Sequence, residues 1–308
     1  MMGRKSMARV VVLGAGIGGV PMAFELRQLL SKVTEVVVVN QGEWFNFTPS
    51  NPWVAIDWRK PNDIRVNLSE VFPRFGIRFN SSGCKRVLPD QNVLILGDGT
   101  HLEYDYLVIA TGPKLGFDEI EGMGPDRHSV SICQTDHADK ARGQWDSFCK
   151  DPGPMVVGAV QGASCFGPAY EFAFLASADL RKRRVRDRVP MTFVTSEPYI
   201  GHLGLGGVGD TKTMLESALR DRDIKWICNA KVDRINADSV EVSELNEDGS
   251  LKKQHKLASK MSMFLPAFKG VECLQGEDGK WIDGLTNPRG FILIDKHQRN
   301  PAFRNVFA

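Results

Sequence analysis

Short runs of apolar, mostly β-branched residues alternate along the chain with stretches whose apolar positions recur at helical spacing. The runs at residues 9–13 and 35–39 are typical of buried parallel strands. Residues 20–30 lie between them and carry apolar side chains three and four positions apart, which predicts a helix. A strand, a turn, a helix and a second strand within about 30 residues indicate the first unit of a nucleotide-binding α/β fold.

The same order of elements recurs in the second half of the chain. Residues 155–160 predict a strand that runs into a turn and a helix, and residues 191–195 predict the strand that follows. A hairpin is expected within residues 240–256, around the turn Glu247-Asp248-Gly249. Further strands are expected at 93–96, 106–109, 290–295 and 305–308.

These elements predict an α/β chain with two Rossmann-like domains, each of the FAD/NAD(P)-binding, three-layer ββα type. We expect a first, FAD-binding domain at residues 8–115, to which residues 285–308 return. We expect the second domain, which carries a redox cysteine, at residues 116–284. The chain stops within the strand expected at 305–308, without a cap or a polar tail. We therefore expect that the C-terminal part of the fold is missing.

Three glycines in the first turn have the spacing of a dinucleotide-binding loop. Gly14 makes the tight turn, Gly16 lets backbone approach a pyrophosphate, and Gly19 lets the helix pack close to the strand. At the end of the second strand an acidic residue usually binds the ribose hydroxyls, and here Asn40 and Gln41 stand instead. An amide binds a ribose less strongly than a carboxylate does. The sequence therefore predicts an FAD-type site with a weakened ribose contact.

The corresponding turn of the second half carries a thiol where a nicotinamide nucleotide would bind. Residues 158–171 read Gly-Ala-Val-Gln-Gly-Ala-Ser-Cys-Phe-Gly-Pro-Ala-Tyr-Glu, so no third glycine follows Gly158 and Gly162 at the phosphate position. Cys165 stands at the start of the predicted helix, whose N-terminal partial charge favours a thiolate. One flavin-type site and one thiol-bearing turn predict a flavoenzyme that oxidises sulfur.

Composition and charge narrow the classes of partner. The chain is 42% hydrophobic and 25% charged, as ordinary globular proteins are, and its formal net charge of +2 gives no case for a nucleic-acid partner. Its six cysteines do not fall into C-x-x-C pairs, so no metal site is expected. Residues 1–9 lack an apolar signal-peptide core, and no uninterrupted apolar run is long enough for a spanning helix. We expect neither a signal peptide nor a transmembrane helix.

The chain resembles the sulfide:quinone oxidoreductases, flavoproteins of the two-dinucleotide, disulfide-reductase-like superfamily. The most specific shared stretch is residues 162–171, and the likeness extends from about residue 8 to residue 308. It covers nearly all of this chain, though not all of the family's length. The other shared stretches are Pro49-Ser50-Asn51-Pro52-Trp53, Ala110-Thr111-Gly112-Pro113-Lys114, Ser131-Ile132-Cys133, Asp136-His137-Ala138, residues 195–203 and residues 266–271.

The resemblance implies FAD as the cofactor and a set of redox cysteines. Family members use three cysteines, of which two match Cys133 and Cys165, and the third lies in a C-terminal region beyond residue 308. That region also carries the last flavin contacts, most of the quinone pocket and the helices that sit on the membrane. By resemblance, the flavin contacts in this chain include Pro49, Asn51, Val87, Ala110, Thr111 and Gly112, beside the glycine turn.

The resemblance also implies a role for each thiol. Cys165 would lie nearest the flavin and deliver electrons, and Cys133 would carry sulfane sulfur or, in some members, be linked to the flavin. Glu171, His137 and His202 are candidates for proton handling, because sulfide arrives partly as HS⁻ and quinone reduction takes up protons. Glu171 lies in an otherwise apolar helix, where an unpaired carboxylate is costly.

The expected activity is the oxidation of sulfide to sulfane sulfur or polysulfide through redox cysteines and FAD, with electrons passed to a membrane quinone. The full-length family form would bind peripherally to the membrane through the missing C-terminal region. The sequence does not decide whether the protein forms a homo-oligomer. Three alternatives remain. They are a type II NADH:quinone oxidoreductase, the flavin subunit of a flavocytochrome c sulfide dehydrogenase, and a non-catalytic flavin-binding fragment.

Overall fold

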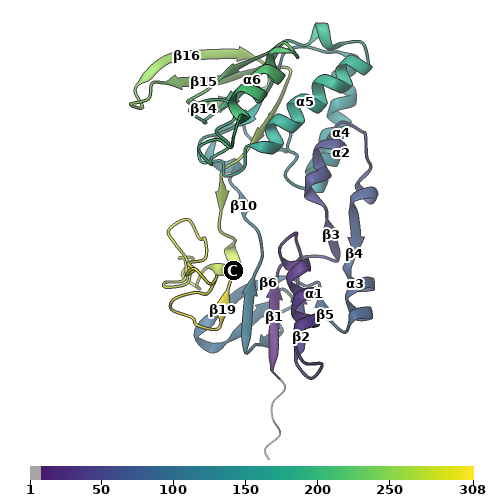
Figure 1. Cartoon of the computed structure of the whole chain (residues 1–308), viewed down its shortest axis with the longest axis vertical. Helices are drawn as coiled ribbons and strands as arrows, with labels where there is room; N and C mark the ends of the chain where they lie inside the picture. The colour runs from purple at the N-terminus through teal and green to yellow at the C-terminus, as the bar shows by residue number, and fades with distance from the viewer. Residues whose placement is uncertain (1–7) are drawn as a thin grey trace, which may run out of the picture. The chain divides into compact units, whose positions relative to one another are not determined.

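The computed structural model describes residues 8–308, and within them the chain packs as two compact units (Figure 1). Unit 1 comprises the described residues up to Phe47, together with Arg65–Lys114 and Lys269–Ala308. Unit 2 comprises Thr48–Ile64 and Leu115–Phe268. Each unit therefore draws on segments that are far apart in the sequence.

This division differs from the predicted one in two places. Residues 48–64 pack in unit 2, because the indoles of Trp53 and Trp58 donate hydrogen bonds to carboxylates of a unit 2 helix. Residues 269–284 pack in unit 1, because Cys273 and Leu274 are buried in its core. Neither of these two segments interrupts a periodic pattern of apolar residues, so the sequence does not predict the unit in which each one packs. We call residues 48–64 the 48–64 excursion.

Unit 1 is built on a five-stranded parallel sheet in the order β19-β9-β1-β2-β5. Alternate residues of each strand face opposite sides. Val11 and its neighbours pack against an antiparallel three-stranded sheet, while Val12 packs on the side of the helix α1. The elements are β1 (Arg9–Leu13), α1 (Gly19–Leu29), β2 (Glu35–Val39), β3 (Trp44–Asn46), β4 (Arg65–Asn67), α3 (Leu68–Val71), β5 (Arg78–Asn80), β6 (Cys84–Leu88), β7 (Val93–Leu96), β8 (His101–Glu103), β9 (Tyr106–Ile109) and β19 (Val306–Phe307).

Unit 2 repeats this plan with a four-stranded parallel sheet in the order β13-β12-β11-β17. Helices α4 and α5 share one hydrophobic cluster with the sheet, and the antiparallel strands β14, β15 and β16 share another (Figure 1). The elements are α2 (Asn51–Ala55), α4 (Thr135–Lys150), β11 (Met155–Ala159), α5 (Gly167–Lys182), β12 (Met191–Thr195), α6 (Thr211–Arg220), β13 (Ile224–Ile227), β14 (Ala230–Ile235), β15 (Ser239–Leu245), β16 (Leu251–Ala258) and β17 (Met261–Leu265). The chain passes between the units within β10 (Lys114–Leu115) and β18 (Phe268–Lys269).

The predicted α/β class, with a parallel sheet between a helical layer and a second β layer in each half, is confirmed. The hairpin expected within 240–256 is also present, as β15 and β16. The strand expected at 290–295 is wrong. There the backbone is irregular apart from an isolated bridge between Thr286 and Ile292, and the side-chain amide of Asn300 donates to the carbonyl oxygens of Gly284, Leu285 and Leu293. An apolar run alone did not distinguish this loop from a strand.

None of the helices within residues 8–308 combines the length and the apolar character that crossing a bilayer requires. No signal peptide was expected at the start of the chain. Residues 1–7 of that stretch lie outside the described residues.

A buried carboxylate ties three segments of unit 2 together. Asp179 on α5 is 3% exposed, and it accepts hydrogen bonds from the indole nitrogens of Trp58 and Trp145, each at 2.8 Å. The guanidinium of Arg183 donates to the same carboxylate at 2.6 Å. The three donors come from the 48–64 excursion, from α4 and from Arg183, the residue that follows α5. Asp179 therefore fixes the excursion to the helical layer.

We expect Asp179→Ala to lower the free energy of unfolding by about 3–5 kcal/mol, because two indole N–H groups and one guanidinium lose a buried acceptor. Urea unfolding followed by tryptophan fluorescence measures this loss. Asp146→Ala is the matched control, since Asp146 is half-exposed and pairs with Lys150 and Arg183 at the surface. Its expected cost is below about 1 kcal/mol. Equal costs for the two variants would contradict the role of Asp179.

Candidate functional site

The glycine turn of unit 1 is shaped by two close backbone approaches and is open at its middle. Gly14 has a φ of 105°, and a Cβ on it would lie 2.3 Å from the carbonyl oxygen of Ala110. A Cβ on Gly19 would lie 1.9 Å from the carbonyl oxygen of Gly14. A Cβ on Gly16, in contrast, would meet no atom within 4 Å. The turn keeps free space beside its main chain, so these positions fit the pyrophosphate of FAD.

Asn40 holds this turn rather than standing free at the end of β2. Its Oδ1 accepts from the backbone N–H of Ala15 at 2.9 Å, and its Nδ2 donates to the carbonyl oxygens of Gln41 and Gly42. The side chain of the exposed Gln41 lies against Gly83, because a Cβ on Gly83 would come within 2.1 Å of the Gln41 Oε1. Asn40 therefore contributes to the predicted site by fixing the turn, and contact of either amide with a ribose stays a prediction.

The other predicted flavin residues of unit 1 differ in what they can offer. Ala110 supplies the main chain against which Gly14 packs, and Gly112 has a φ of 67° with open space around it. The Thr111 hydroxyl donates to the carbonyl oxygen of Gly112 at 3.1 Å. Val87 is 0% exposed in the core, so its side chain is unavailable and only its backbone could meet a ligand.

Pro49 and Asn51 lie in the 48–64 excursion and pack with unit 2. Pro49 is exposed within a short 3₁₀ turn, and Asn51 is fully buried at the start of α2. The Oδ1 of Asn51 accepts from the hydroxyl of Thr135 at 3.1 Å. Its Nδ2 finds no hydrogen-bond partner within residues 8–308. A buried amide donor without a partner is uncommon, and it fits the expectation that Asn51 contacts a ligand.

The two predicted redox cysteines lie close enough to interact electrostatically. Cys133 precedes α4, and Cys165 precedes α5. Burial raises the pKa of the Cys133 thiol to about 11, the Ser131 hydroxyl partly offsets this rise, and the nearby Cys165 thiol adds to it. The fold thus brings together two thiols that the sequence placed 32 positions apart.

Burial outweighs the effect of the helix start on Cys165, although that effect has the expected direction and lowers the thiol pKa. Cys165 is exposed as a residue, yet burial of its sulfur raises its pKa, and the hydrogen bond from the backbone N–H of Gly167 offsets only part of the rise. The thiol stands before the first helical residue, Gly167, so it meets a single N–H rather than the full helix end. Both thiols therefore need a proton acceptor before they can react.

A serine and a histidine stand beside Cys133. Ser131 is fully buried, and its hydroxyl oxygen accepts from the backbone N–H of Cys133 at 3.2 Å. The same oxygen lies 3.3 Å from Nδ1 of His137. Burial lowers the pKa of His137, although Asp126 and Asp136 oppose the shift. The imidazole is therefore neutral near pH 7 and can accept a proton through the Ser131 hydroxyl.

Glu171 has a partner that the sequence reading did not identify. Its Oε1 accepts from the indole nitrogen of Trp53 at 3.1 Å, which joins α5 to the 48–64 excursion. Arg59 lies over the ring of Trp53, with its guanidinium carbon 5.2 Å from the ring centroid. Trp53 thus sets the position of the Glu171 carboxylate. Its sequence motif alone does not indicate this role.

His202 lies in a glycine-rich loop after β12, and its Nδ1 accepts from the backbone N–H of Gly204 at 3.2 Å. The buried Glu197 holds this loop in place. Its Oε1 accepts from the backbone N–H of Leu203, and its Oε2 accepts from the hydroxyl of Tyr170. Within the part of the chain that the structure describes, neither Glu171 nor His202 hydrogen-bonds to the two thiols. Their proton-handling roles stay predictions.

The thiol-bearing turn of unit 2 is filled by the protein's own contacts. Gln161 Oε1 accepts from the backbone N–H of Val232, and Gln161 Nε2 donates to the Val232 carbonyl, each at 3.0 Å. Ala163 forms an isolated bridge with Ala267. A Cβ on Gly162 would already touch the Ala267 side chain at 3.4 Å. The open glycine of this stretch, Gly167, is the first residue of α5, whereas Gly162 lies against Ala267. The hydrogen-bonded side chain of Gln161 disfavours a bound pyrophosphate in the turn.

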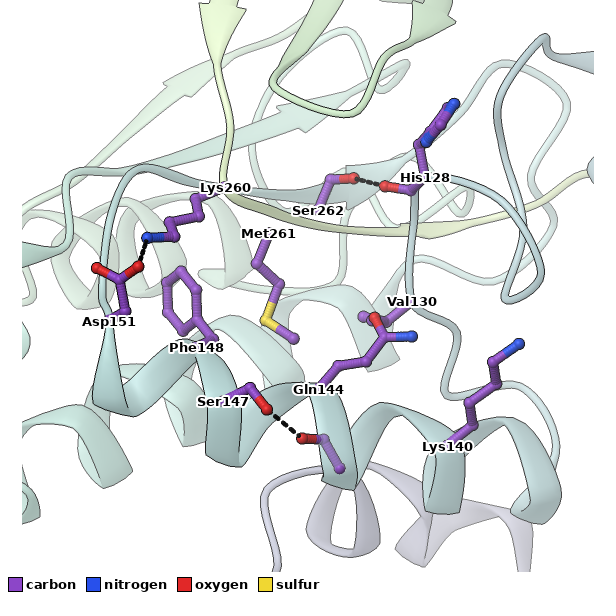
Figure 2. A pocket seen from close by; sticks show the side chains of 11 residues that line it. His128, Val130, Lys140, Gln144, Ser147, Phe148, Asp151, Lys260, Met261 and Ser262 are labelled. Atoms are coloured by element: carbon purple, nitrogen blue, oxygen red, sulfur yellow. Dashed lines mark hydrogen bonds and ion pairs between the residues drawn. The ribbon is translucent and has the colours of Figure 1, made fainter.

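A cavity of 630 Å³ lies elsewhere on unit 2, between α4 and the start of β17 (Figure 2). Phe148 and Met261 give it apolar walls, and Lys260 at its rim pairs with Asp151. None of the predicted site residues lines this cavity. The candidate functional residues, which are the glycine turn in unit 1 and the two thiols in unit 2, therefore do not belong to this cavity.

Comparisons with known proteins agree with this geometry. A family model described as pyridine nucleotide-disulphide oxidoreductase matches residues 8–308. A sulfide-quinone reductase of Aquifex aeolicus is 40% identical over 299 residues, which cover 97% of this chain and 66% of that relative. The crystal structure of the sulfide:quinone oxidoreductase from Aquifex aeolicus matches with a TM-score of 0.90 at 39% identity, covering 97% of this chain and 67% of that one.

A mitochondrial sulfide:quinone oxidoreductase of Mus musculus is 24% identical over 98% of this chain and 65% of its own length. This chain thus spans about two thirds of the length of these relatives. The resemblance stated from the sequence motifs is confirmed.

The thiol pKa values predict the order in which the cysteines are alkylated. At pH 7 only about one Cys133 in ten thousand is a thiolate, because its pKa is about 11. We expect the exposed Cys165 to react with iodoacetamide first. The rate at Cys133 should rise about tenfold per pH unit up to pH 10, as measured by mass spectrometry of the labelled peptides.

Ser131→Ala should slow the labelling of Cys133 further at each pH, because the hydroxyl lowers the thiol pKa. Ser147→Ala is the control, since the Ser147 hydroxyl bonds only to a carbonyl within α4. A Cys133 rate that levels off below pH 9 would show that the thiol is not shielded as described.

Proposed function

Because the chain belongs to the pyridine nucleotide-disulphide oxidoreductase family, we propose that it oxidises sulfide to sulfane sulfur or polysulfide through Cys133 and Cys165. FAD is the cofactor, and a quinone of the membrane pool is the final acceptor. Sulfide and quinone enter the proposal from the names of the relatives. The observation that carries it is the thiol pair: Cys165 stands in the turn where related folds hold a nicotinamide nucleotide, and the nearby Cys133 lies beside Ser131 and His137.

The glycine turn of unit 1 would hold the cofactor. Gly14 and Gly19 fix the turn, and Gly16 leaves room for a pyrophosphate against the N-terminus of α1. FAD, when bound, supplies a two-electron acceptor between sulfur and quinone. Members of this family are FAD-dependent flavoproteins, and the open turn is consistent with that.

Proton removal is the first task of the protein side chains. A thiol attacks sulfur only as a thiolate, and burial keeps Cys133 protonated at neutral pH. The neutral imidazole of His137 can take the proton, with the hydroxyl of Ser131 as the intermediate donor and acceptor. His137 thus acts as the base for Cys133.

Two neighbouring thiols suit sulfur transfer. A thiolate that attacks a sulfur–sulfur bond forms a new sulfur–sulfur bond and releases the other sulfur. Since Cys133 and Cys165 lie close together, sulfane sulfur can pass between them without being released to solvent. The exposed Cys165 can also meet an incoming sulfur species directly. We assign Cys165 to electron delivery and Cys133 to carrying sulfane sulfur.

The side chain of Gln161 occupies the unit 2 turn, which favours sulfide oxidation over oxidation of NADH. A nicotinamide nucleotide needs an open phosphate-binding turn, and here Gln161 is fixed to β14 by two hydrogen bonds. A lipid-soluble quinone as acceptor would place the reaction at a membrane surface, which is part of the proposal.

Cys165→Ala should reduce the rate of sulfide-dependent flavin reduction at least about 1,000-fold, because the electron-delivering sulfur is removed. Stopped-flow absorbance under anaerobic conditions measures the rate in chain loaded with FAD. Cys149→Ala is the matched control, since Cys149 is buried in the core on α4 and is not part of the proposed site. It should retain the wild-type rate. An unchanged rate in Cys165→Ala would remove Cys165 from the mechanism.

A further inference from the structure

Two thiols that the proposed reaction does not use meet in the core of unit 1. Cys84 is the first residue of β6, and Cys273 lies in the short 3₁₀ helix Glu272–Leu274. The strand and this helix pack against each other, Cys84 packs against the hydrophobic cluster that contains Cys273, and the two thiols lie near enough to shift each other's pKa. They stand 189 positions apart in the chain, so no local sequence pattern pairs them.

Two ion pairs link the segment that carries Cys273 to other parts of unit 1. The guanidinium of Arg86, two residues after Cys84, pairs with Glu277 at 2.5 Å. The ammonium of Lys114 pairs with Glu272, next to Cys273. Cys273 itself is 9% exposed and packs with Leu274 and Leu285. Cys84 packs against the same cluster, so the packing of unit 1 keeps the two cysteines near each other.

The two thiols differ in acidity. The neighbouring Cys84 lowers the pKa of Cys273, whereas the neighbouring Cys273 and burial raise the pKa of Cys84, which keeps its proton. Cys273 is thus the nucleophile of the pair, and Cys84 is the thiol that can resolve an oxidised Cys273.

We propose that Cys84 and Cys273 form a second redox dithiol, which a small peroxide closes into a disulfide between β6 and the 272–274 helix. The Cys273 thiolate attacks one oxygen of hydrogen peroxide, the O–O bond breaks, and a sulfenic acid and hydroxide form. The Cys84 sulfur then attacks the Cys273 sulfur, and the S–O bond breaks. The proton of Cys84 leaves with that oxygen as water. Two thiols and one peroxide give one disulfide and two waters, with two electrons passing from sulfur to oxygen.

The bond would fasten residues 269–308 to the rest of unit 1. This segment supplies β19, the edge strand beside β9. A cross-link between segments so distant in sequence strongly restricts the unfolded chain and local opening. The oxidised protein should therefore hold its C-terminal segment more firmly than the reduced protein does.

The test is peptide mapping of the full chain after treatment with hydrogen peroxide. The protein is denatured with iodoacetamide present, digested without reduction and analysed by mass spectrometry. We expect a linked Cys84–Cys273 peptide, two hydrogens lighter than the sum of its parts, and loss of alkylation at both thiols. Limited proteolysis within residues 269–308 should slow at least about threefold in the same sample.

Variants separate this pair from the other thiols. Cys84→Ser should remove the linked peptide and leave Cys273 as a sulfenic acid that a 1,3-diketone traps. Cys149→Ala, which lacks a buried thiol of unit 2, should keep the linked peptide. The wild-type map decides the question even if Cys84→Ser does not fold. Full alkylation of Cys84 and Cys273 after peroxide treatment would overturn the proposal, and so would disulfides from either thiol to any other cysteine.

Discussion

A glycine in the left-handed region shortly after a parallel strand sets the path of the turn in each unit. Gly14 has a φ of 105° after β1, and Gly162 has a φ of 76° after β11. Each turn then leads into a helix that packs on its own sheet. From this shared start the two turns diverge. Gly16 leaves open space in unit 1, whereas the turn of unit 2 is closed by Gln161 and carries Cys165. The turn of unit 1 is therefore suited to holding a cofactor, whereas the turn of unit 2 presents a thiol.

Burial governs the acidity of Cys133, Cys165 and His137. It raises the pKa of both thiols, so the helix start alone does not activate them. It also lowers the pKa of His137, which leaves a neutral imidazole one hydroxyl away from Cys133. The same environment that suppresses the thiolate therefore supplies its base. Buried carboxylates play a different part, since Asp179 and Glu197 position segments around the site.

Local patterns predicted the layers of the fold but not the paths between them. Strands β1, β2 and β12 and the hairpin follow from apolar runs and turn residues that act over short distances. The excursion 48–64 depends on indole bonds from Trp53 and Trp58 to α5, across more than a hundred residues, and no periodicity encodes them. The cysteines and His137 were found from their motifs, whereas Ser131 was quoted without a role, because only the folded loop brings its hydroxyl to the imidazole. The pKa of Cys165 depends on burial, which the sequence does not reveal.

The most direct test of the central claim is the visible spectrum of the purified chain, recorded under anaerobic conditions before and after sulfide and, separately, NADH. We expect a flavin band that bleaches with sulfide and persists with NADH, because the unit 2 turn carries Cys165 and is closed by Gln161. A flavin band that NADH bleaches and sulfide leaves unchanged would contradict the account. A colourless protein would contradict the claim that this glycine turn holds FAD in the chain as it stands.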